Sequence, residues 1–264
     1  HVVSYSQHIR SAKRGYNSAH SYDPQLNLMF LFSSRLRLPV FYRILPGNIR
    51  EIKAFKLTIE ESKLEDVVVI ADKGFYSEAN INCLDQEGLD YIIPLRRDSR
   101  LINYQRVEQP RKQGFEGYFS FNNRYIWYYT LSIDRVRKIV VFYDEQLRLR
   151  EESDYLRRIE KYPEEYTREN FHDRESRFGT LALYTNLVPI GASDIYHYYK
   201  SREDIETMFD TMKNILQLDS SYMQDELAFE GWMFISYLAL QWYYHLFKLL
   251  LDKRLSSKYS VKDL

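Results

Sequence analysis

An apolar run that ends on a carboxylate constrains the fold of this chain more than any other feature. Residues 67–71, VVVIA, are preceded by two acids and followed by Asp72, Lys73 and Gly74. Five apolar residues bounded in this way predict a short buried strand. An aspartate at the carboxyl end of such a strand lies at the edge of the sheet, where open α/β sheets bind ligands and metals. The simpler alternative is that Asp72 only begins an Asp-Lys-Gly turn.

The apolar patterns on either side of this run predict an α/β fold with a mixed sheet. Three strands are expected first, then a helix, the strand that ends at Asp72, a second helix and a further strand. In order, these segments are 2–6, 26–32, 38–45, 50–63, 67–71, 77–87 and 90–95.

The pattern changes after Leu95. Aromatic and polar residues alternate around Asn122-Asn123, which is typical of a β-hairpin. Residues 145–175 hold ten acids and seven bases, which predicts a solvated helix or linker. A buried strand is expected over 178–187 and mostly helix over 193–251. We therefore expect three parts: a first core segment (1–95), a β-rich insertion with a charged helix or linker (96–177) and a second, helical core segment (178–264).

The charge of the chain is zero overall but unevenly distributed. Residues 1–50 carry seven Lys and Arg residues against one acid, Asp23, so this part has a charge of +6 and the remainder −6. A second basic cluster contains Arg96, Arg97, Arg100, Arg106, Arg111 and Lys112. Basic clusters of this kind are compatible with a nucleic-acid partner, although the net charge is zero. The alternative is that they are ordinary solvated surface.

Composition also bears on the cellular compartment and on the membrane. The single cysteine, Cys83, excludes a disulfide framework and a Cys-rich zinc site and fits a reducing cytosol. The apolar stretch 232–251 is interrupted by Gln241, His245 and Lys248. A lysine inside a bilayer costs about 2.5–3.5 kcal/mol on insertion scales. A buried core helix that ends at Lys253-Arg254 is therefore expected in place of a membrane span. A cytoplasmic protein is expected from these two features.

A second group of polar residues lies on the predicted helix SDIYHYYKSREDIETMFDTMKNIL, residues 193–216. At about 100° per residue, Tyr199, Arg202, Glu206 and Lys213 share an arc of about 60°. The apolar residues Ile205, Met208, Phe209, Met212, Ile215 and Leu216 form a separate buried stripe. The alternative is a set of solvated ion pairs four residues apart, such as Arg202 with Glu206. Glu203 and Asp210 fall on a neighbouring part of the helix, outside this arc, so Glu206 is the candidate among the three acids.

The spacing Tyr199-x2-Arg202-x3-Glu206-x6-Lys213 resembles the Y-R-E-K signature of insertion-sequence transposases of the DDE superfamily. The segment IADKGFYS resembles the one that carries the second catalytic aspartate of that group, which corresponds to Asp72. GYNSAHSYDPQLNLMF, LPVFYRILPGNI and LYTNL are also similar to family sequence, so the resemblance extends over nearly the whole chain.

This resemblance implies a ribonuclease-H-like fold with a β-rich insertion between the second aspartate and the glutamate. It also implies metal-dependent cleavage and transfer of phosphodiester bonds by Asp72 and Glu206, as ligands of two Mg²⁺ (or Mn²⁺) ions. Hard cations of this kind prefer carboxylate oxygens. Arg202 and Lys213 suit contacts with DNA phosphates, and Tyr199 suits a hydrogen bond to a phosphate or stacking near a base.

The family pattern also requires a first aspartate on the first strand, just before VVSYS. The sequence begins at His1, so we expect this residue and an N-terminal end-binding region to lie outside it, as in an N-terminally truncated transposase. Asp23, the only acid before Glu51, lies in a Tyr-Asp-Pro turn outside the motif and is a weak substitute. A chain extended upstream is expected to nick a cognate DNA end in Mg²⁺, and the 264-residue chain is not.

Other chemistries have little support. The sequence has no G-x-S-x-G, phosphate-binding P-loop, H-E-x-x-H or Cys-x-x-Cys motif. His8 and His20 lack a partner pattern and are expected to be surface or structural residues. Trp127 is expected to pack in the hairpin, while the resemblance also allows a contact with an unpaired base at a transposon end.

The main hypothesis is a core for cut-and-paste DNA transposition, impaired by loss of the first aspartate and acting as a homodimer on double-stranded DNA. The resemblance then implies a nucleoid-associated protein in the cytoplasm. The second is a catalytically inactive remnant that binds DNA or a transposase partner. The third is a general ribonuclease-H-like nuclease, which would cut unrelated DNA.

Overall fold

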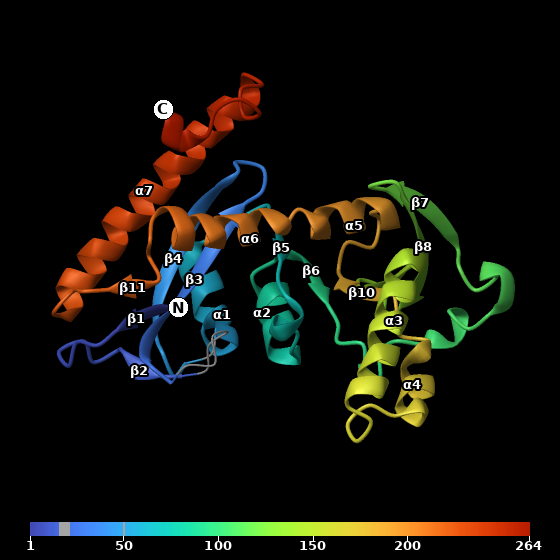
Figure 1. The fold of residues 1–264 in the computed structure, drawn as a ribbon. Coiled ribbons are helices and arrows are strands. Elements are labelled where there is room, and N and C mark those ends of the chain that lie inside the picture. The colour runs from blue at the N-terminus through green and yellow to red at the C-terminus, as the bar shows by residue number, and fades with distance from the viewer. Residues whose placement is uncertain (16–21, 50) are drawn as a thin grey trace. The chain divides into compact units, whose positions relative to one another are not determined.

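The computed structural model describes residues 1–15, 22–49 and 51–264, and for 51–53 the backbone alone (Figure 1). His20 and most of the first half of the family-like segment 15–30 lie outside the described residues. The chain divides into two compact units, each with its own sheet and core. Unit 1 comprises His1–Lys63 and Lys200–Leu264, and unit 2 comprises Leu64–Tyr199.

Unit 1 contains a five-stranded mixed sheet. Its strand order is β11-β1-β3-β2, with β4 paired to β3, and β1 runs parallel to β11 while the other pairs are antiparallel. The expected strands over 2–6, 26–32 and 38–45 are confirmed, and the two-residue strands β2 and β11 are additional. The bounds are β1 Val2–Ser4, β2 Lys13–Arg14, β3 Pro24–Ser33, β4 Leu38–Pro46 and β11 Ser220–Ser221.

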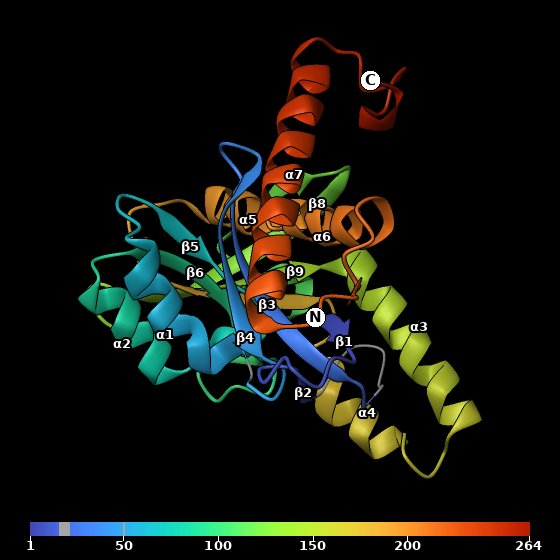
Figure 2. The same ribbon diagram turned by 90° about the vertical axis from the view of Figure 1, so that its left-hand side faces the viewer.

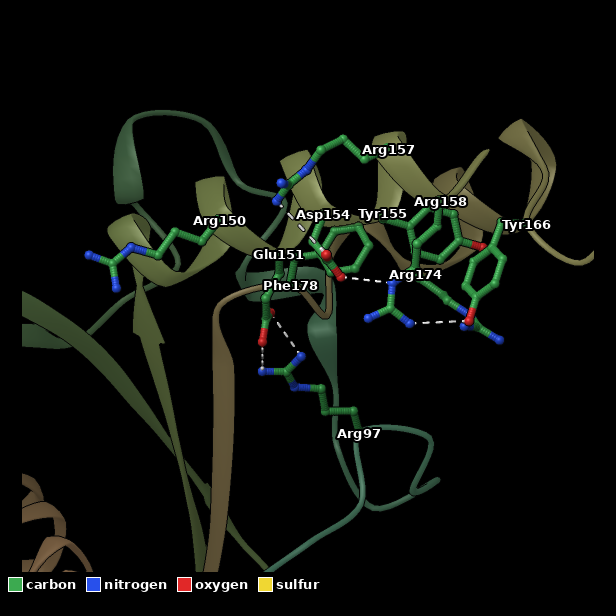
Figure 3. A pocket seen from close by; sticks show the side chains of 10 residues that line it. All are labelled: Arg97, Arg150, Glu151, Asp154, Tyr155, Arg157, Arg158, Tyr166, Arg174 and Phe178. Atoms are coloured by element: carbon green, nitrogen blue, oxygen red, sulfur yellow. Dashed lines mark hydrogen bonds and ion pairs between the residues drawn. The ribbon is translucent and has the colours of Figure 1, made fainter. Parts of the chain in front are cut away.

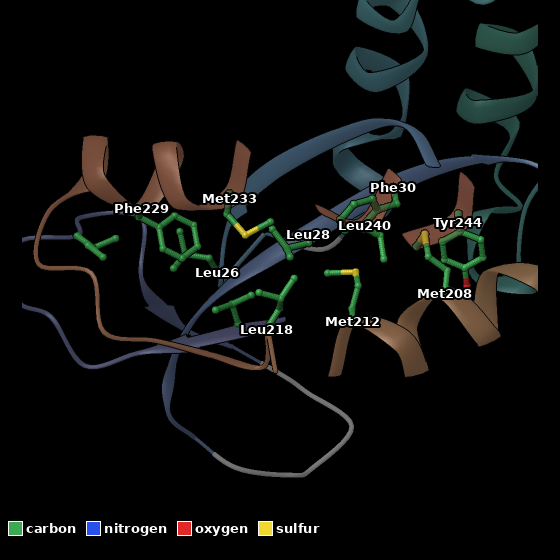
Figure 4. Packing of buried hydrophobic residues seen from close by; sticks show 12 residues of the cluster. Leu26, Leu28, Phe30, Met208, Met212, Leu218, Phe229, Met233, Leu240 and Tyr244 are labelled. Carbon is green, nitrogen blue, oxygen red and sulfur yellow. The ribbon is translucent and has the colours of Figure 1, made fainter. Parts of the chain in front are cut away.

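Two layers of unit 1 meet at the apolar face of β3. Leu26, Leu28 and Phe30 of this strand are buried against Phe229, Met233, Leu240 and Tyr244 of helix α7 (Glu226–Asp252) (Figure 4). Met208 and Met212 enter the same cluster from helix α6 (Glu203–Asp210) and a π-helical turn (Thr211–Ile215). Helix α1 (Glu51–Ser62) follows β4, as predicted for 50–63. The periodicity of β3 and α7 therefore creates the core of this unit.

Helix α7 confirms the expected helix over 232–251 but corrects the expectation that it is buried. Its buried side chains recur on one face, while Phe234, Ile235 and Trp242 are between 53% and 67% exposed. Asp225 starts the helix by accepting the N–H of Ala228 at 2.9 Å. Within the described part of the chain, no helix combines the length and apolar character needed to cross a membrane.

Unit 2 contains a six-stranded mixed sheet with the order β5-β6-β10-β9-β8-β7. The pair β5–β6 is parallel and the remaining pairs are antiparallel. The strands of the predicted insertion therefore continue the sheet that begins with the strand before Asp72. The bounds are β5 Val68–Ile70, β6 Asp90–Pro94, β7 Gly117–Phe121, β8 Arg124–Ser132, β9 Lys138–Asp144 and β10 Thr180–Thr185.

Three helices of unit 2 begin at side-chain caps that the sequence provides. Ser77, Asp144 and Thr167 accept backbone N–H groups at the starts of α2, α3 and α4. The predicted helix over 77–87 is confirmed, and the charged region 145–175 forms two helices joined by a short connection. The bounds are α2 Glu78–Gln86, α3 Glu145–Lys161, α4 Arg168–Glu175 and α5 Ala192–Lys200, with 3-10 turns at Lys73–Phe75, Tyr104–Arg106 and Pro110–Lys112. A further 3-10 turn, Val261–Asp263, belongs to unit 1.

The boundaries of the two units differ from those of the three predicted parts. The chain crosses between units after Lys63 and after Tyr199, not after Leu95 and Arg177. Compact units are defined by contacts within the fold, whereas the predicted parts follow the change of sequence pattern after Leu95 and the return of a buried-strand pattern at Phe178. The three-part division therefore stays a prediction.

Candidate active site

Asp72 lies two residues after Ile70, the last residue of strand β5, and so just beyond the carboxyl end of the strand. Its Oδ1 accepts the N–H of Lys73 at 2.7 Å, and its backbone oxygen accepts the N–H of Phe75 at 2.9 Å. These bonds form the Asp-Lys-Gly turn that was the simpler alternative for Asp72. The carboxylate is nevertheless exposed and makes no ion pair with any described residue. Asp72 is thus both the cap of a turn and an accessible oxygen donor.

Strand β5 is less buried than expected. It lies at the edge of the six-stranded sheet, and its described partner is β6, with Ile70 opposite Ile92. Val67 and Val68 are each 37% exposed. An edge strand pairs on one side only, so part of its apolar surface stays uncovered.

The helix predicted over 193–216 is interrupted twice. Helix α5 ends at Lys200, α6 begins at Glu203, and the turn Thr211–Ile215 is π-helical, with the N–H of Leu216 bound to the oxygen of Thr211 at 3.1 Å. Both features change the rotation per residue. The predicted arc of about 60° for Tyr199, Arg202, Glu206 and Lys213 assumed a uniform 3.6-residue turn. It therefore does not describe where these four side chains lie around the axis. A π-turn inside a helix is a frequent feature of functional sites.

Glu206 lies on the exposed side of α6, one turn after Arg202. The two side chains form an ion pair, with 3.3 Å between Arg202 Nη2 and Glu206 Oε1, and they are 31% and 64% exposed respectively. An exposed pair of this spacing contributes about 0.3–0.5 kcal/mol. This is the solvated ion pair that the sequence offered as the alternative to a functional site. A pair this weak does not prevent Glu206 from binding another cation.

Lys213 lies in the π-helical turn, with an exposed side chain. It lines a cavity of about 460 Å³ in unit 1, together with Asp219, Tyr222 and Trp232. A cation at the mouth of such a cavity suits an anionic ligand.

Tyr199 is only 6% exposed and belongs to the core of unit 2. It packs in a buried cluster that includes Ile92, Phe142 and Leu183. Its predicted contact with DNA stays a prediction, as do those of Arg202 and Lys213.

The predicted site residues are divided between the units. Asp72 and Tyr199 belong to unit 2, and Arg202, Glu206 and Lys213 belong to unit 1. Convergence of the two carboxylates, with oxygens about 4–7 Å apart on a metal pair, stays a prediction.

The two carboxylates suit a hard divalent cation in their donor chemistry. Both are exposed, and Asp72 has one oxygen outside the capping bond. Oxygen ligands of this type are those that Mg²⁺ and Mn²⁺ prefer. Among the residues that the structure describes, no group of three or more His, Cys, Asp or Glu side chains is gathered as a ready-made metal site.

Remaining candidates from the sequence lie apart from a recognisable site. His8 pairs through its backbone with Asp225. Asp23 faces Tyr5, where it raises the pKa of the phenol by accepting its hydrogen bond. Trp127 packs against Phe115 and Tyr118, at ring-centroid distances of 5.9 and 5.0 Å, in agreement with a packing role.

An arginine-lined groove in unit 2 was not predicted from the sequence. It has a volume of about 640 Å³ and lies along α3 and α4 (Figure 3). Five arginines and two acids line it, and the signal that could have indicated it is the recurrence of Arg150 and Arg157 seven residues apart on one helix. The lining residues are Arg97, Arg150, Glu151, Asp154, Tyr155, Arg157, Arg158, Tyr166, Arg174 and Phe178.

Only part of this positive charge is neutralised within the groove. Arg97 forms a bidentate pair with Glu151, with both N–O distances 2.9 Å. Arg158 contacts Asp154 at 2.8 Å and the hydroxyl of Tyr166 at 3.2 Å. Arg150 and Arg174 make no ion pair with a described residue. Two exposed guanidinium groups therefore remain available to an anion.

Comparison with known proteins gives the chain a context. A family model described as "Transposase DDE domain" matches residues 2–242. Among solved structures, a cryo-EM structure of a piggyBac transposase synaptic complex with hairpin DNA matches with a TM-score of 0.53 and 11% identity. The match covers 95% of this chain and 47% of the other, so the chain spans about half the length of that transposase. No curated protein sequence matches significantly. The match in structure confirms the predicted ribonuclease-H-like α/β fold.

Proposed function

Because the chain belongs to the transposase DDE domain family, we propose that it is a catalytic core for cut-and-paste DNA transposition. The reaction is hydrolysis and transfer of phosphodiester bonds at the ends of an insertion-sequence element. The observation that carries this proposal is the match of the family model over residues 2–242, a range that includes Asp72 and Glu206.

Asp72 and Glu206 are the residues we assign to metal binding. Each is an exposed carboxylate, and Asp72 is held by its capping bond at the end of β5. Two bound Mg²⁺ or Mn²⁺ ions would supply activation of the attacking oxygen and stabilisation of the leaving oxygen. The chain's own contribution is to fix the two ligands, while Arg202 is close enough to Glu206 to orient its carboxylate.

Double-stranded DNA is the proposed partner, bound by a homodimer. Arg202 offers a cation beside Glu206, and Lys213 offers one in the π-helical turn that follows α6. The groove along α3 and α4 adds Arg150 and Arg174, which form no ion pair with a described residue. Phosphate contacts of this kind supply most of the affinity for DNA and make it dependent on salt.

The experiment that tests the catalytic assignment uses the protein as its gene encodes it and duplexes taken from the DNA flanking that gene. We expect nicking that requires Mg²⁺ or Mn²⁺ and falls at least about 100-fold in Asp72→Asn and Glu206→Gln, since each removes a charged metal ligand. Glu203→Gln and Asp210→Asn are matched controls, because they neutralise acids on the same helical segment. Cleavage that survives in both site variants would contradict the assignment.

An inactive DNA-binding remnant is the second candidate. Its support is that both carboxylates have a role in the described structure that needs no metal: Asp72 caps a turn, and Glu206 pairs with Arg202. Binding of the duplexes without any cleavage, unchanged in Asp72→Asn, would favour this candidate.

Binding itself tests the cationic residues. Arg202→Ala and Lys213→Ala should each weaken binding of duplex ends and lower the salt dependence by about one phosphate contact. Lys253→Ala, which removes an exposed cation just after α7, serves as the control. Unchanged binding at every salt concentration would show that both residues belong to ordinary solvated surface and do not contact DNA.

A further inference from the structure

Helix α7 carries a second apolar face, opposite the one that packs on β3. Leu227, Phe234, Leu238, Trp242 and Leu249 are 80%, 53%, 39%, 65% and 45% exposed. With about 100° per residue, these five residues together with Gly231 and His245 lie within about 40° on either side of Leu238. The stripe extends over about 33 Å of helix and contains no Asp, Glu, Lys or Arg. Contiguous apolar surface of this size usually marks an interaction site.

The spacing of the stripe is the same in both directions from its centre. Toward either end of the helix, the other stripe residues lie four, seven and eleven residues from Leu238. Two antiparallel copies of α7 that cross at Leu238 would therefore place Phe234 opposite Trp242, Gly231 opposite His245 and Leu227 opposite Leu249. A two-fold interface requires such self-complementarity, since the same surface serves both partners.

Gly231 provides an independent indication. It lies inside a 27-residue helix, it is exposed, and a Cβ added there would meet nothing within 4 Å. An exposed glycine inside a helix costs about 0.5–1 kcal/mol relative to alanine, and no contact described within the chain requires it. Opposite the imidazole of His245, the missing side chain would leave room for close approach.

The charges beside the stripe favour the antiparallel arrangement. Glu230 and Lys248 lie on the same flank, each about 80° from Leu238, and neither forms an ion pair with a described residue. In the antiparallel pair Glu230 of one copy lies across from Lys248 of the other, displaced by about 3 Å along the axis. In a parallel pair each would face the opposite flank, where Ala239 and Leu246 stand.

The available area corresponds to a small specific interface. Six large side chains lie on or beside the stripe, namely the five given above and Ile235, which is 67% exposed. If each exposes on the order of 100 Å², about half the 150–250 Å² of a buried aromatic residue, one copy offers about 600 Å². Two copies would then bury about 1,200 Å², the lower end of the range of about 1,200–2,000 Å² for specific interfaces. We propose that the α7 stripe is a homodimer interface, formed by two antiparallel copies of this helix around Leu238. It concerns the assembly and not the catalytic carboxylates.

Sedimentation velocity without DNA or metal tests the proposal independently of catalysis. We expect a species of twice the 31.9 kDa chain mass at micromolar concentration, and a monomer for Trp242→Glu. Leu57→Glu is the matched control, because Leu57 is a 48% exposed leucine on α1. Urea unfolding of each variant confirms that the monomer is folded. A wild-type monomer up to about 100 µM, a range that covers weak interfaces of this size, would overturn the proposal and assign the stripe to another partner or segment.

Two further experiments test the geometry. Glu230→Lys or Lys248→Glu alone should weaken dimerisation about three- to tenfold, and the double exchange should restore it. In cross-linking, a mixture of Leu227→Cys and Leu249→Cys chains should form heterodimers efficiently, while each alone should not; the native Cys83 is buried. Efficient cross-linking of either variant with itself would contradict the antiparallel arrangement.

Discussion

At the residue scale, Asp72 combines a structural bond with an accessible carboxylate. It caps the short turn Lys73–Phe75 through the Lys73 N–H, while the rest of the carboxylate is exposed. We expect Asp72→Asn to keep this cap, because the amide oxygen accepts the same bond, and to change the free energy of unfolding by less than about 0.5 kcal/mol. Asp72→Ala loses the bond and should cost about 0.5–1 kcal/mol.

Urea unfolding of the two variants measures this difference, and metal-dependent cleavage provides the second readout. A purely structural aspartate would give an active Asn variant and an impaired Ala variant. Equal loss of cleavage in both, with stability lost only in Ala, is the result that a metal ligand predicts.

The pair Arg202–Glu206 shows why sequence alone leaves a candidate site open. The spacing of four residues predicts an ion pair, and the structure contains one at 3.3 Å. The same Glu206 suits a metal ligand. Both interpretations use the same exposed carboxylate, so only a partner that lies far away in sequence can decide between them.

At the element scale, the β7–β8 hairpin is the clearest local prediction that the structure confirms. Asn122 and Asn123 connect the strands with φ of 48° and 59°, the left-handed values of a type I′ turn. Asn123→Gly should therefore raise the free energy of unfolding by a few tenths of a kcal/mol, and Asn123→Val should lower it by about 1–2 kcal/mol. Urea denaturation checks both signs. A stable Val variant would mean that the turn has another conformation.

Elements whose pattern is ambiguous were harder to predict. Strand β9 was not expected, although most of its residues are buried. Its apolar run of five residues, Ile139–Tyr143, lies next to a charged helix and fits strand and helix alike. The break between α5 and α6 and the π-turn after Asp210 leave the apolar periodicity almost unchanged. Backbone geometry of this kind depends on tertiary packing, which periodicity does not report.

The groove along α3 and α4 leads to a prediction for DNA binding. Arg150 and Arg174 project without an ion pair, Arg174 with its guanidinium carbon 5.9 Å from the ring centre of Tyr155 (Figure 3). The double variant Arg150→Ala/Arg174→Ala should weaken duplex binding about three- to tenfold at low salt, with a shallower salt dependence. Fluorescence anisotropy over a salt series measures both.

Arg135→Ala is the control for this experiment. Arg135 is exposed in the same unit, in the β8–β9 connection, and lies outside the groove. Equal losses in the control and in the double variant would mean that only net charge matters and would assign no role to the groove.

At the scale of the whole molecule, the sequence predicted the α/β class but not which strands share a sheet. The pairing of β6 with β10 joins residues about ninety apart, Pro94 with Leu183 for example. Figure 2 shows α7 in front of β3 and β4, the strands on which it packs. Strands β5 and β6 share their sheet with β10 and β9. Long-range pairings depend on how whole faces pack, so a local pattern constrains them only through the fold of a known family.

The abundance of tyrosine has a consequence for the whole molecule, since many of these side chains are buried. Burial is the main cause that raises the pKa of Tyr91, Tyr129 and Tyr244, and that of seven other tyrosines in the two units: Tyr42, Tyr76, Tyr104, Tyr143, Tyr184, Tyr237 and Tyr243. A group whose pKa is raised by folding stabilises the native state below its unfolded pKa, here about 10. That contribution is lost as the pH rises toward the folded pKa.

We therefore expect steep alkaline unfolding that begins near pH 10. Each tyrosine that ionises only in the unfolded chain lowers the free energy of unfolding by about 1.4 kcal/mol per pH unit above that point. Lys138 opposes this trend, because burial lowers the pKa of its amine, but it is a single group. Urea unfolding should be measured from pH 8 to 11, with phenolate absorbance recorded in parallel. We expect the free energy of unfolding to fall above pH 10 with a slope against pH that corresponds to the release of more than one proton. Tyr129→Phe should reduce that slope by about one proton. Gradual ionisation of most tyrosines in the folded protein, before any loss of stability, would show that the buried rings are accessible to solvent.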